Sequence, residues 1–318
     1  MAIQIGMQAR ISAGEESTAG SEVARTAVAR LASTTLQRAV AKDIVPHLVG
    51  SGASAANPVD FFETVGTVGG DAEINAAYQG GALGMWLKHA MGAVTTTGAG
   101  PYAHAFSLAG SLPAGLSLCV ERGSLGSLGD EELLGCKIDS FELSVAPAQV
   151  MACRMTFIGM TGSARGSDTP PALATLYPIT HRHAGTLSFD SQTYTLSSFT
   201  LRISNNMTTV AELGSLYSSE PQRNGFQTVE IEAELVARSD ALFTASLAST
   251  QGDVSVTFTD SPRILAIVLH NAVIFEFSDP ISAAGIIKQK VTWRGLGDGS
   301  DHGLLVTLTN ANSSAVVS

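Results

Sequence analysis

The sequence predicts a mainly β protein made of two tandem antiparallel β-sandwich or barrel units, each flanked by one short α-helix. Three observations support this fold class. Short alternating, β-branched or aromatic runs are separated by Gly, Ser, Asp and Pro, which is typical of antiparallel sheets. Only two segments show helical spacing of apolar residues. The same motifs recur in the same order in both halves of the chain.

The strand prediction rests most firmly on four short runs. They are Leu116–Val120, Met155–Phe157, Val254–Phe258 and Lys290–Trp293. Each run alternates or is rich in β-branched and aromatic residues, which fit a pleated, half-buried surface. We therefore expect strands at these positions, joined by polar turns.

One helix is predicted within residues 81–92, where apolar residues recur at helical spacing and Gly92 provides a C-terminal stop. Its apolar residues are Leu83, Trp86, Leu87, Ala90 and Met91. A second helix is predicted over residues 240–249, with Ser239 placed to cap it. Its narrower apolar face consists of Leu242, Phe243 and Leu247.

An internal repeat relates the two halves. Acidic pairs precede both helices at one offset of 159 residues: Asp71 and Glu73 in the first half, Glu230 and Glu232 in the second. Farther on, FELS at 141–144 is echoed by FEFS at 275–278, and MTFIG at 155–159 by VTWRG at 291–295. The first half carries extra Gly, Pro and Ser between residues 95 and 129. Chance similarity between short strands remains the alternative.

The repeat divides the chain into four parts. Residues 1–60 are rich in Ala, Ser and Thr and are expected to form an extended N-terminal arm or lead-in. Residues 61–160 form the first β unit. Residues 161–183, interrupted by Gly and Pro, form a linker, and residues 184–318 form the second unit.

Composition restricts the class of protein. The 318 residues are 45% hydrophobic and 14% charged, which excludes a disordered chain and indicates that much surface is shared with other subunits. A net charge of −10 disfavours tight binding to nucleic acid.

The longest uninterrupted apolar stretch, Ile264–Leu269, is too short to cross a membrane. The three cysteines, Cys119, Cys136 and Cys153, suit buried reduced thiols.

No catalytic, cofactor-binding or metal-binding residues are predicted, and we expect no enzyme activity. The sequence lacks the usual nucleophile, phosphate-binding and zinc motifs in a supporting context. On a strand, His181 and His183 would share one face as two metal ligands, but no third ligand is identifiable nearby. A solvated loop is the favoured interpretation of this pair.

Charge patterning points to a candidate surface. Three carboxylates share one face of a predicted strand: Glu230, Glu232 and Glu234. Three basic residues share one face of the last predicted strand: Lys288, Lys290 and Arg294. The two rows are candidates for pairing across strands or between subunits, with two independently solvated faces as the alternative. Facing a shared channel, the carboxylates would form a negative wall.

A family resemblance rests on an ordered series of segments. They are VGGDAEI at 68–74, the predicted helix at 83–92, YAH at 102–104, LP at 112–113, GCKIDSF at 135–141 and MTFIG at 155–159. In this order residues 67–160 resemble the tail tube proteins of long-tailed, siphovirus-like bacteriophages. Residues 185–295 resemble the same unit more loosely, and residues 1–60 match only as a variable lead-in.

The resemblance implies a structural virion protein, the major tail tube subunit. Its tail-tube-type β units would join those of neighbouring subunits into a barrel, and stacked rings would form the tube through which the genome leaves. Six similar units commonly close such rings, so a duplicated chain predicts a trimer with pseudo-sixfold symmetry. The expected partners are the chain itself and the tape measure and distal tail proteins. DNA would pass without tight binding, and the protein would reside in the virion tail after assembly in the host cytoplasm, without contacting a membrane.

Other readings remain open at this point. Within the same class, the chain is compatible with a terminator, neck or distal tail ring protein. In a different class, a carbohydrate-binding β-sandwich would use Trp86 and Trp293 to stack on sugars, although both tryptophans lie on predicted apolar faces. A metal hydrolase built on His181 and His183 is the third alternative.

Overall fold

A computed structural model describes residues 9–39, 42–44, 61–122, 130–162, 171–280, 287–296 and 303–316. Its described residues form a mainly β structure in which the named strand pairs are antiparallel, which confirms the predicted mainly β, antiparallel class. The strands of the first part of the chain are β1 (Arg10–Glu15), β2 (Ala27–Thr34), β3 (Gln37–Ala39), β4 (Lys42–Ile44), β5 (Phe61–Glu63), β6 (Thr67–Asn75), β7 (Ala77–Gln79), β8 (Gly92–Thr97), β9 (Tyr102–Leu108), β10 (Leu116–Glu121), β11 (Glu131–Val145), β12 (Ala152–Gly159) and β13 (Thr161–Gly162).

The remaining strands are β14 (Tyr177–Pro178), β15 (Leu187–Phe189), β16 (Gln192–Tyr194), β17 (Leu196–Ser204), β18 (Met207–Thr208), β19 (Gln222–Arg223), β20 (Thr228–Val236), β21 (Gln251–Asp260), β22 (Arg263–Ser278), β23 (Lys288–Arg294) and β24 (Leu304–Asn310). The helices are α1 (Leu83–Met91), α2 (Ala241–Leu247) and a 3-10 turn, η3 (His181–His183). The four runs that the sequence analysis singled out all lie in strands.

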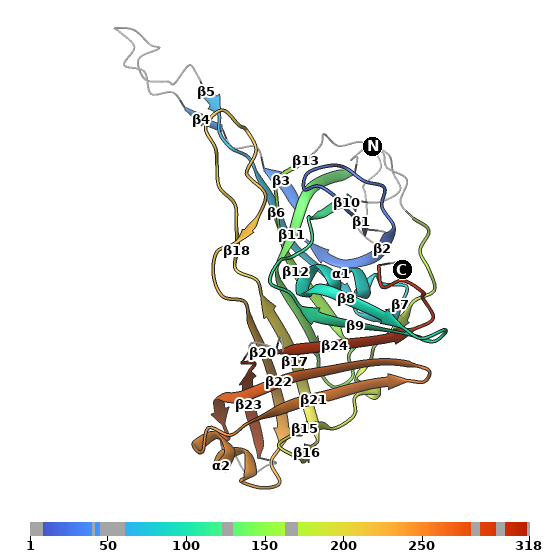
Figure 1. The fold of residues 1–318 in the computed structure, drawn as a ribbon, viewed down its shortest axis with the longest axis vertical. Helices are drawn as coiled ribbons and strands as arrows, with labels where there is room; N and C mark the ends of the chain where they lie inside the picture. The colour runs from blue at the N-terminus through green and yellow to red at the C-terminus, as the bar shows by residue number, and fades with distance from the viewer. Residues whose placement is uncertain are drawn as a thin grey trace.

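One long sheet organises the molecule. Its strands follow the order β2, β6, β12, β11, β17, β20, β23 and β22, and each pairs antiparallel with the next. Figure 1 shows this sheet running diagonally through the molecule, with blue and green strands at one end and orange and red strands at the other. Strands far apart in the sequence therefore meet in one continuous surface, which we call the long sheet.

Two long strands connect the long sheet to a second layer. The C-terminal part of β11 pairs with β12 and β17 in the long sheet, whereas its N-terminal part pairs with β10 and β13. In the same way, β22 pairs with β23 at its C-terminal end and with β21 and β24 at its N-terminal end. The apolar core, including Trp86 and Trp293, is fully buried between these elements.

The two predicted helices are present but are buried to different degrees. All apolar side chains of α1 are buried, and Gly92 follows its last residue, as predicted. In α2 only Leu242 is buried, while Phe243 and Leu247 are exposed. The predicted cap by Ser239 is wrong: the N-cap residue is Asp240, which makes no side-chain capping bond because its backbone is not extended.

Part of the expected lead-in packs in the fold. Strand β1 pairs with β10 and β2, and the side chains of Ile11, Ala13 and Ala27 are fully buried. Small residues such as alanine bury little apolar surface, so the alternation of hydrophobic and polar residues in this segment is weak. For that reason the sequence predicted an extended arm. Residues 1–8, 40–41 and 45–60 of the lead-in lie outside the described residues. The division into units at residues 61, 161 and 184 stays a prediction.

Two further predictions concern the burial of the cysteines and the absence of a membrane-spanning segment. All three cysteines are buried, and burial raises the pKa of Cys136 and Cys153 well above the usual range. Among the described residues, no helix has the length and apolar character that a bilayer crossing needs.

Candidate functional surface

The face of the long sheet that points away from the core is polar. Along each strand, single charged residues alternate with apolar residues that enter the core, because successive side chains point to opposite faces. Glu142 lies between the buried Phe141 and Leu143, and Arg202 between the buried Leu201 and Ile203. We call this surface the polar face.

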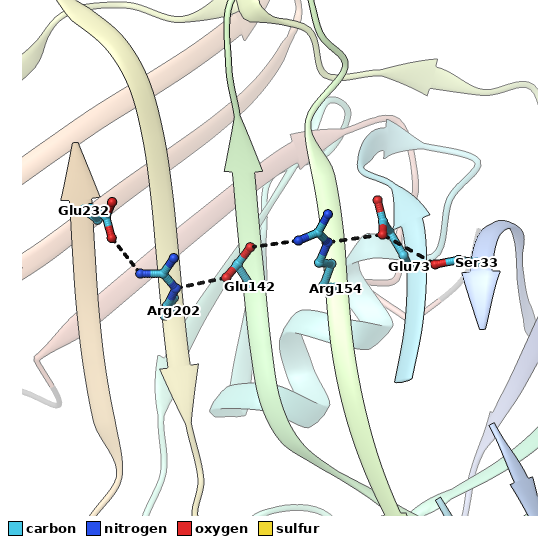
Figure 2. Close-up of polar contacts among 6 residues, drawn as sticks. All are labelled: Ser33, Glu73, Glu142, Arg154, Arg202 and Glu232. Atoms are coloured by element: carbon cyan, nitrogen blue, oxygen red, sulfur yellow. Dashed lines mark hydrogen bonds and ion pairs between the residues drawn. The ribbon is translucent and has the colours of Figure 1, made fainter. Parts of the chain in front are cut away.

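A row of alternating charges crosses the polar face from strand to strand (Figure 2). Arg154 on β12 lies between two carboxylates, with its Nε donating to Glu73 Oε2 at 3.2 Å and its Nη1 4.0 Å from Glu142 Oε1. Arg202 on β17 continues the row, because its Nε donates to Glu142 at 2.9 Å and its Nη1 to Glu232 at 2.8 Å. Lys290 on β23 closes it, 2.8 Å from Glu232. We call this row the charge ladder.

The two charge rows from the sequence meet within one chain. Each acidic residue of β20 contacts a basic residue of the adjacent β23. Lys288 lies 3.1 Å from Glu234, Lys290 lies 2.8 Å from Glu232, and Arg294 Nε donates to Glu230 at 3.0 Å. The structure therefore brings all six residues together across one strand pair.

The contacts favour the charged forms of two ladder residues, Glu232 and Arg202. Burial acts to raise the pKa of Glu232, but hydrogen bonds from Lys290 and Arg202 outweigh it and hold that pKa below the usual range. The hydrogen bond to Glu232, together with Glu142, raises the pKa of Arg202 despite partial burial.

The polar face carries compensating charges rather than a continuous negative wall. Its carboxylates are Asp71, Glu73, Glu142, Glu230, Glu232, Glu234 and Glu276. Its basic residues are Arg154, Arg202, Lys288, Lys290 and Arg294. Exposed ion pairs contribute only about 0.2–1 kcal/mol each, so the chief effect of the ladder is on the electric field at this surface.

A groove of about 440 Å³ lies on the polar face near β2. Ladder residues and hydroxyl groups line it together, and Thr156 donates to Asp71 at 2.7 Å. Its charged lining residues are Asp71, Glu73, Glu142 and Arg154. Within the part of the chain that the structure describes, no cluster of His, Cys, Asp or Glu fits a metal ion.

The structure does not place the residues of the two alternative sites, a metal site at His181 and His183 and a sugar site at Trp86 and Trp293, in the arrangement that those sites need. His181 and His183 lie in η3 rather than on a strand, and the ring of His183 packs against Tyr78 with centroids 5.7 Å apart. Trp86 and Trp293 are both completely buried, so neither presents a ring to a sugar. Both tryptophans and His183 thus take part in packing, whereas His181 is exposed.

Sequence reasoning missed the ladder residues Glu73, Glu142, Arg154 and Arg202. Each is a single charged residue between two apolar ones, a signal present in four separate strands. That pattern assigns each residue to a polar face, but the register between β11 and β17 is needed to show that Glu142 and Arg202 meet.

Comparison with known proteins gives one match. A family model described as phage tail tube protein matches residues 6–295, which is most of the chain. No curated protein matches it.

Proposed function

The chain belongs to the phage tail tube protein family, and from that premise we propose that it assembles with copies of itself into stacked rings that form a hollow tube for the phage genome. Its role as a structural component of the phage tail follows from the family. The match over residues 6–295 is the observation that carries the proposal, because it spans both halves of the chain.

The order of strand pairing supports the proposed internal duplication. In the first half, β2 pairs with β6, β6 with β12 and β12 with β11, and β11 continues to β10 and then to β1. In the second half, β17, β20, β23 and β22 follow in the same way, and β22 continues to β21 and then to β15. The hairpin of β8 and β9 is extra in the first half, where the sequence has its additional residues.

We propose that three chains form one ring. Each chain supplies two similar units to the long sheet, joined side by side where β11 pairs with β17. Three such pairs would supply six units and give threefold symmetry that imitates sixfold. Closing the sheet into a barrel would also remove its open edges, which otherwise promote uncontrolled association.

The polar face suits the lining of the tube. DNA carries about one negative charge per 1.7 Å of its axis, so a basic lining would retain it. The ladder ties up Arg154, Arg202 and Lys290 in ion pairs with carboxylates. A lining of this kind would offer no unopposed cations to phosphates and would let DNA slide past. We further propose contacts with tape measure and distal tail proteins, and assembly in the host cytoplasm before residence in the virion tail.

Imaging of the purified protein tests this function. Negative-stain electron microscopy of concentrated protein should show rings or hollow rods of uniform width. A monodisperse monomer at every concentration and salt condition, also after mixing with purified tails, would refute the proposal. A single ring that never stacks would instead favour a terminator, neck or distal tail role.

A further inference from the structure

The loop that joins β17 to β20 folds back onto the first half of the chain. It leaves the long sheet at the end of β17 and returns to it at the start of β20. Near the middle of the loop, the carbonyl of Leu216 accepts a hydrogen bond from the N–H of Gly66 at 3.2 Å. Figure 1 shows this loop, which carries β18, rising beside β4 and β5 at one end of the molecule. Residues 62–66 and 207–226 therefore form one projection, which we call the crest.

Contacts with the first half fix the crest in place. The side chain of Lys137 is only 7% exposed, and its Nζ lies 2.6 Å from the Glu220 carboxylate of the crest. The guanidinium of Arg38 lies over the ring of Tyr217, 5.9 Å from the ring centroid. Moving Glu220 away would leave the buried charge of Lys137 without this partner, which is strongly unfavourable. The crest is therefore a preformed surface, and its binding to a partner costs little entropy of ordering.

The crest presents apolar side chains to solvent. Its exposed large apolar residues are Phe62, Val210, Leu213, Leu216, Tyr217 and Phe226. Leu213 is completely exposed, in a turn beside Gly214, which has open space around it. A single exposed leucine is ordinary in a soluble protein. Several apolar side chains gathered on one projection are instead typical of a surface that binds another protein.

A second apolar surface lies at the other end of the strands of the long sheet. Strand β20 runs from the crest to Val236, and α2 follows it. The side chains of Phe243, Leu247 and Ile287 are exposed there, and we call these three the α2 surface. The carbonyl of Ile287 accepts from the N–H of Ala237 at 3.0 Å, so Ile287 lies beside the segment that leads into α2. Figure 1 shows α2 at the end of the molecule remote from β4 and β5.

The two ends also carry opposite charges. Glu212 is exposed on the crest next to Leu213, and Arg238 is exposed just before α2. Within the described ranges of the chain, neither side chain makes an ion pair. Asp240 offsets part of the positive charge near α2, so the complementarity is between one carboxylate and one guanidinium. Such a pair at the rim of a contact fixes its orientation more than its strength.

The positions of the two surfaces determine which molecule can join them. They lie at opposite ends of the same strands, so the crest of a chain cannot reach its own α2 surface. A head-to-tail contact between identical molecules repeats from copy to copy, and it builds an open stack when the rotation between copies does not close a ring. The outermost strands of the long sheet, β2 and β22, lie along its sides and belong to neither surface. The partner that fits is therefore a second copy placed end to end with the first.

We propose that the crest of one copy binds the α2 surface of a copy in the adjacent ring. In this contact Leu213 packs against Phe243 and Leu247. Glu212 lies opposite Arg238. The inference rests on the proposed function and identifies its stacking contact. Helix α1, which takes the place of α2 in the first half, has its apolar side chains buried and offers no such surface. Because the loop of the second half folds onto the first, each chain has one crest and one α2 surface, and a ring of three chains would make three stacking contacts with the next ring rather than six.

Chemical cross-linking tests the contact directly. In assembled Leu213→Cys/Leu247→Cys protein, a short bifunctional maleimide should join chains of successive rings, and the native cysteines are buried and do not compete. Denatured samples should then show a series of multimers that extends beyond three chains, whereas neither single variant should give this series. The matched control is Leu213→Cys/Asn75→Cys. Asn75 is exposed at the same end of the long sheet but four strand spacings from β20, about 19 Å away, and should cross-link at least about tenfold less. Equal cross-linking of the two pairs in assembled protein would overturn the assignment to the α2 surface.

Charge reversal tests the orientation of the contact. Glu212→Arg or Arg238→Glu alone should raise the protein concentration needed for tube formation about two- to fivefold at low salt, the range expected of one exposed ion pair per contact. The double variant restores opposite charges and should assemble at a concentration within about twofold of the wild type. Single variants that assemble as well as the wild type, or a double variant no better than either single one, would overturn the opposition of Glu212 and Arg238.

An apolar variant separates stacking from ring formation. Leu213→Ser should still form rings but should need at least about tenfold more protein to stack them, because an exposed leucine no longer becomes buried in the contact. Leu213→Met keeps an apolar side chain of similar volume and should stack as the wild type does. Normal tubes from Leu213→Ser would overturn the crest contact and leave the proposed function standing. A wild-type protein that forms neither rings nor tubes would overturn both.

Discussion

Asn205 holds the two halves of the chain together, and its removal is the sharpest test of that junction. The side chain is fully buried at the end of β17. Its Nδ2 donates to the carbonyls of Ala90 at 3.1 Å and Ile138 at 2.9 Å, while its Oδ1 accepts from Gln227 Nε2 at 2.8 Å. One amide thereby connects α1 and β11 of the first half with β17 and the start of β20 in the second.

Asn205→Ala should lower the free energy of unfolding by about 3 kcal/mol. The magnitude follows from the lost hydrogen bonds to Ala90, Ile138 and Gln227 at about 1 kcal/mol each. The amide of Gln227, left without its acceptor, and the lost 3.5 Å bond from Arg223 Nη2 to Asn205 Oδ1 add to the loss. Urea unfolding of the full chain, followed by fluorescence and circular dichroism, measures the change. The matched control is Asn75→Ala, an exposed position at the end of β6, which should change stability by less than about 0.5 kcal/mol. An Asn205→Ala variant as stable as this control would refute the junction as described.

Three further predictions concern the same fold. Gly84→Ala should destabilise the protein by about 1–3 kcal/mol in thermal unfolding, although alanine favours helices, because the new Cβ would overlap the carbonyl oxygen of Ala315; a rise in Tm would contradict this packing. Burial lowers the pKa of His89, so below about pH 6.5 the unfolded chain binds a proton that the folded chain does not. The free energy of unfolding should therefore fall by up to about 1.4 kcal/mol for each unit by which the pH is lowered below that value. His89→Gln should flatten that slope, and an unchanged slope between pH 6.5 and 5 would exclude His89 as its source. Leu247→Ser should change the free energy of unfolding by less than about 0.5 kcal/mol, because 73% of that side chain is exposed; a larger loss in urea unfolding would contradict the exposed position of Leu247.

Local patterns were enough to predict both helices, four strand runs and the polar face of β20. The spacing of Leu83, Trp86 and Leu87 predicted α1, and the alternation around Glu232 predicted the outward row of β20. Both patterns depend only on residues adjacent in the sequence or one helical turn apart. The predicted contact of that row with Lys288, Lys290 and Arg294 required only one strand pair.

Long-range arrangement was beyond these patterns. The charge ladder depends on the registers of several strand pairs, including β11 with β17, whose residues are 60 apart in the pair Glu142 and Arg202. The packing of β1 was also missed, because Ala13 and Ala27 give little hydrophobic contrast even though they are completely buried. Such features are set by tertiary contacts that no short window of sequence contains.

The most direct test of the account is a cryo-electron microscopy map of the assembled protein in which chains can be traced around one ring. We expect three chains and six similar β units around one ring, with the charge ladder facing the bore. Six chains around a single barrel, or a bore lined by another face of the long sheet, would contradict it.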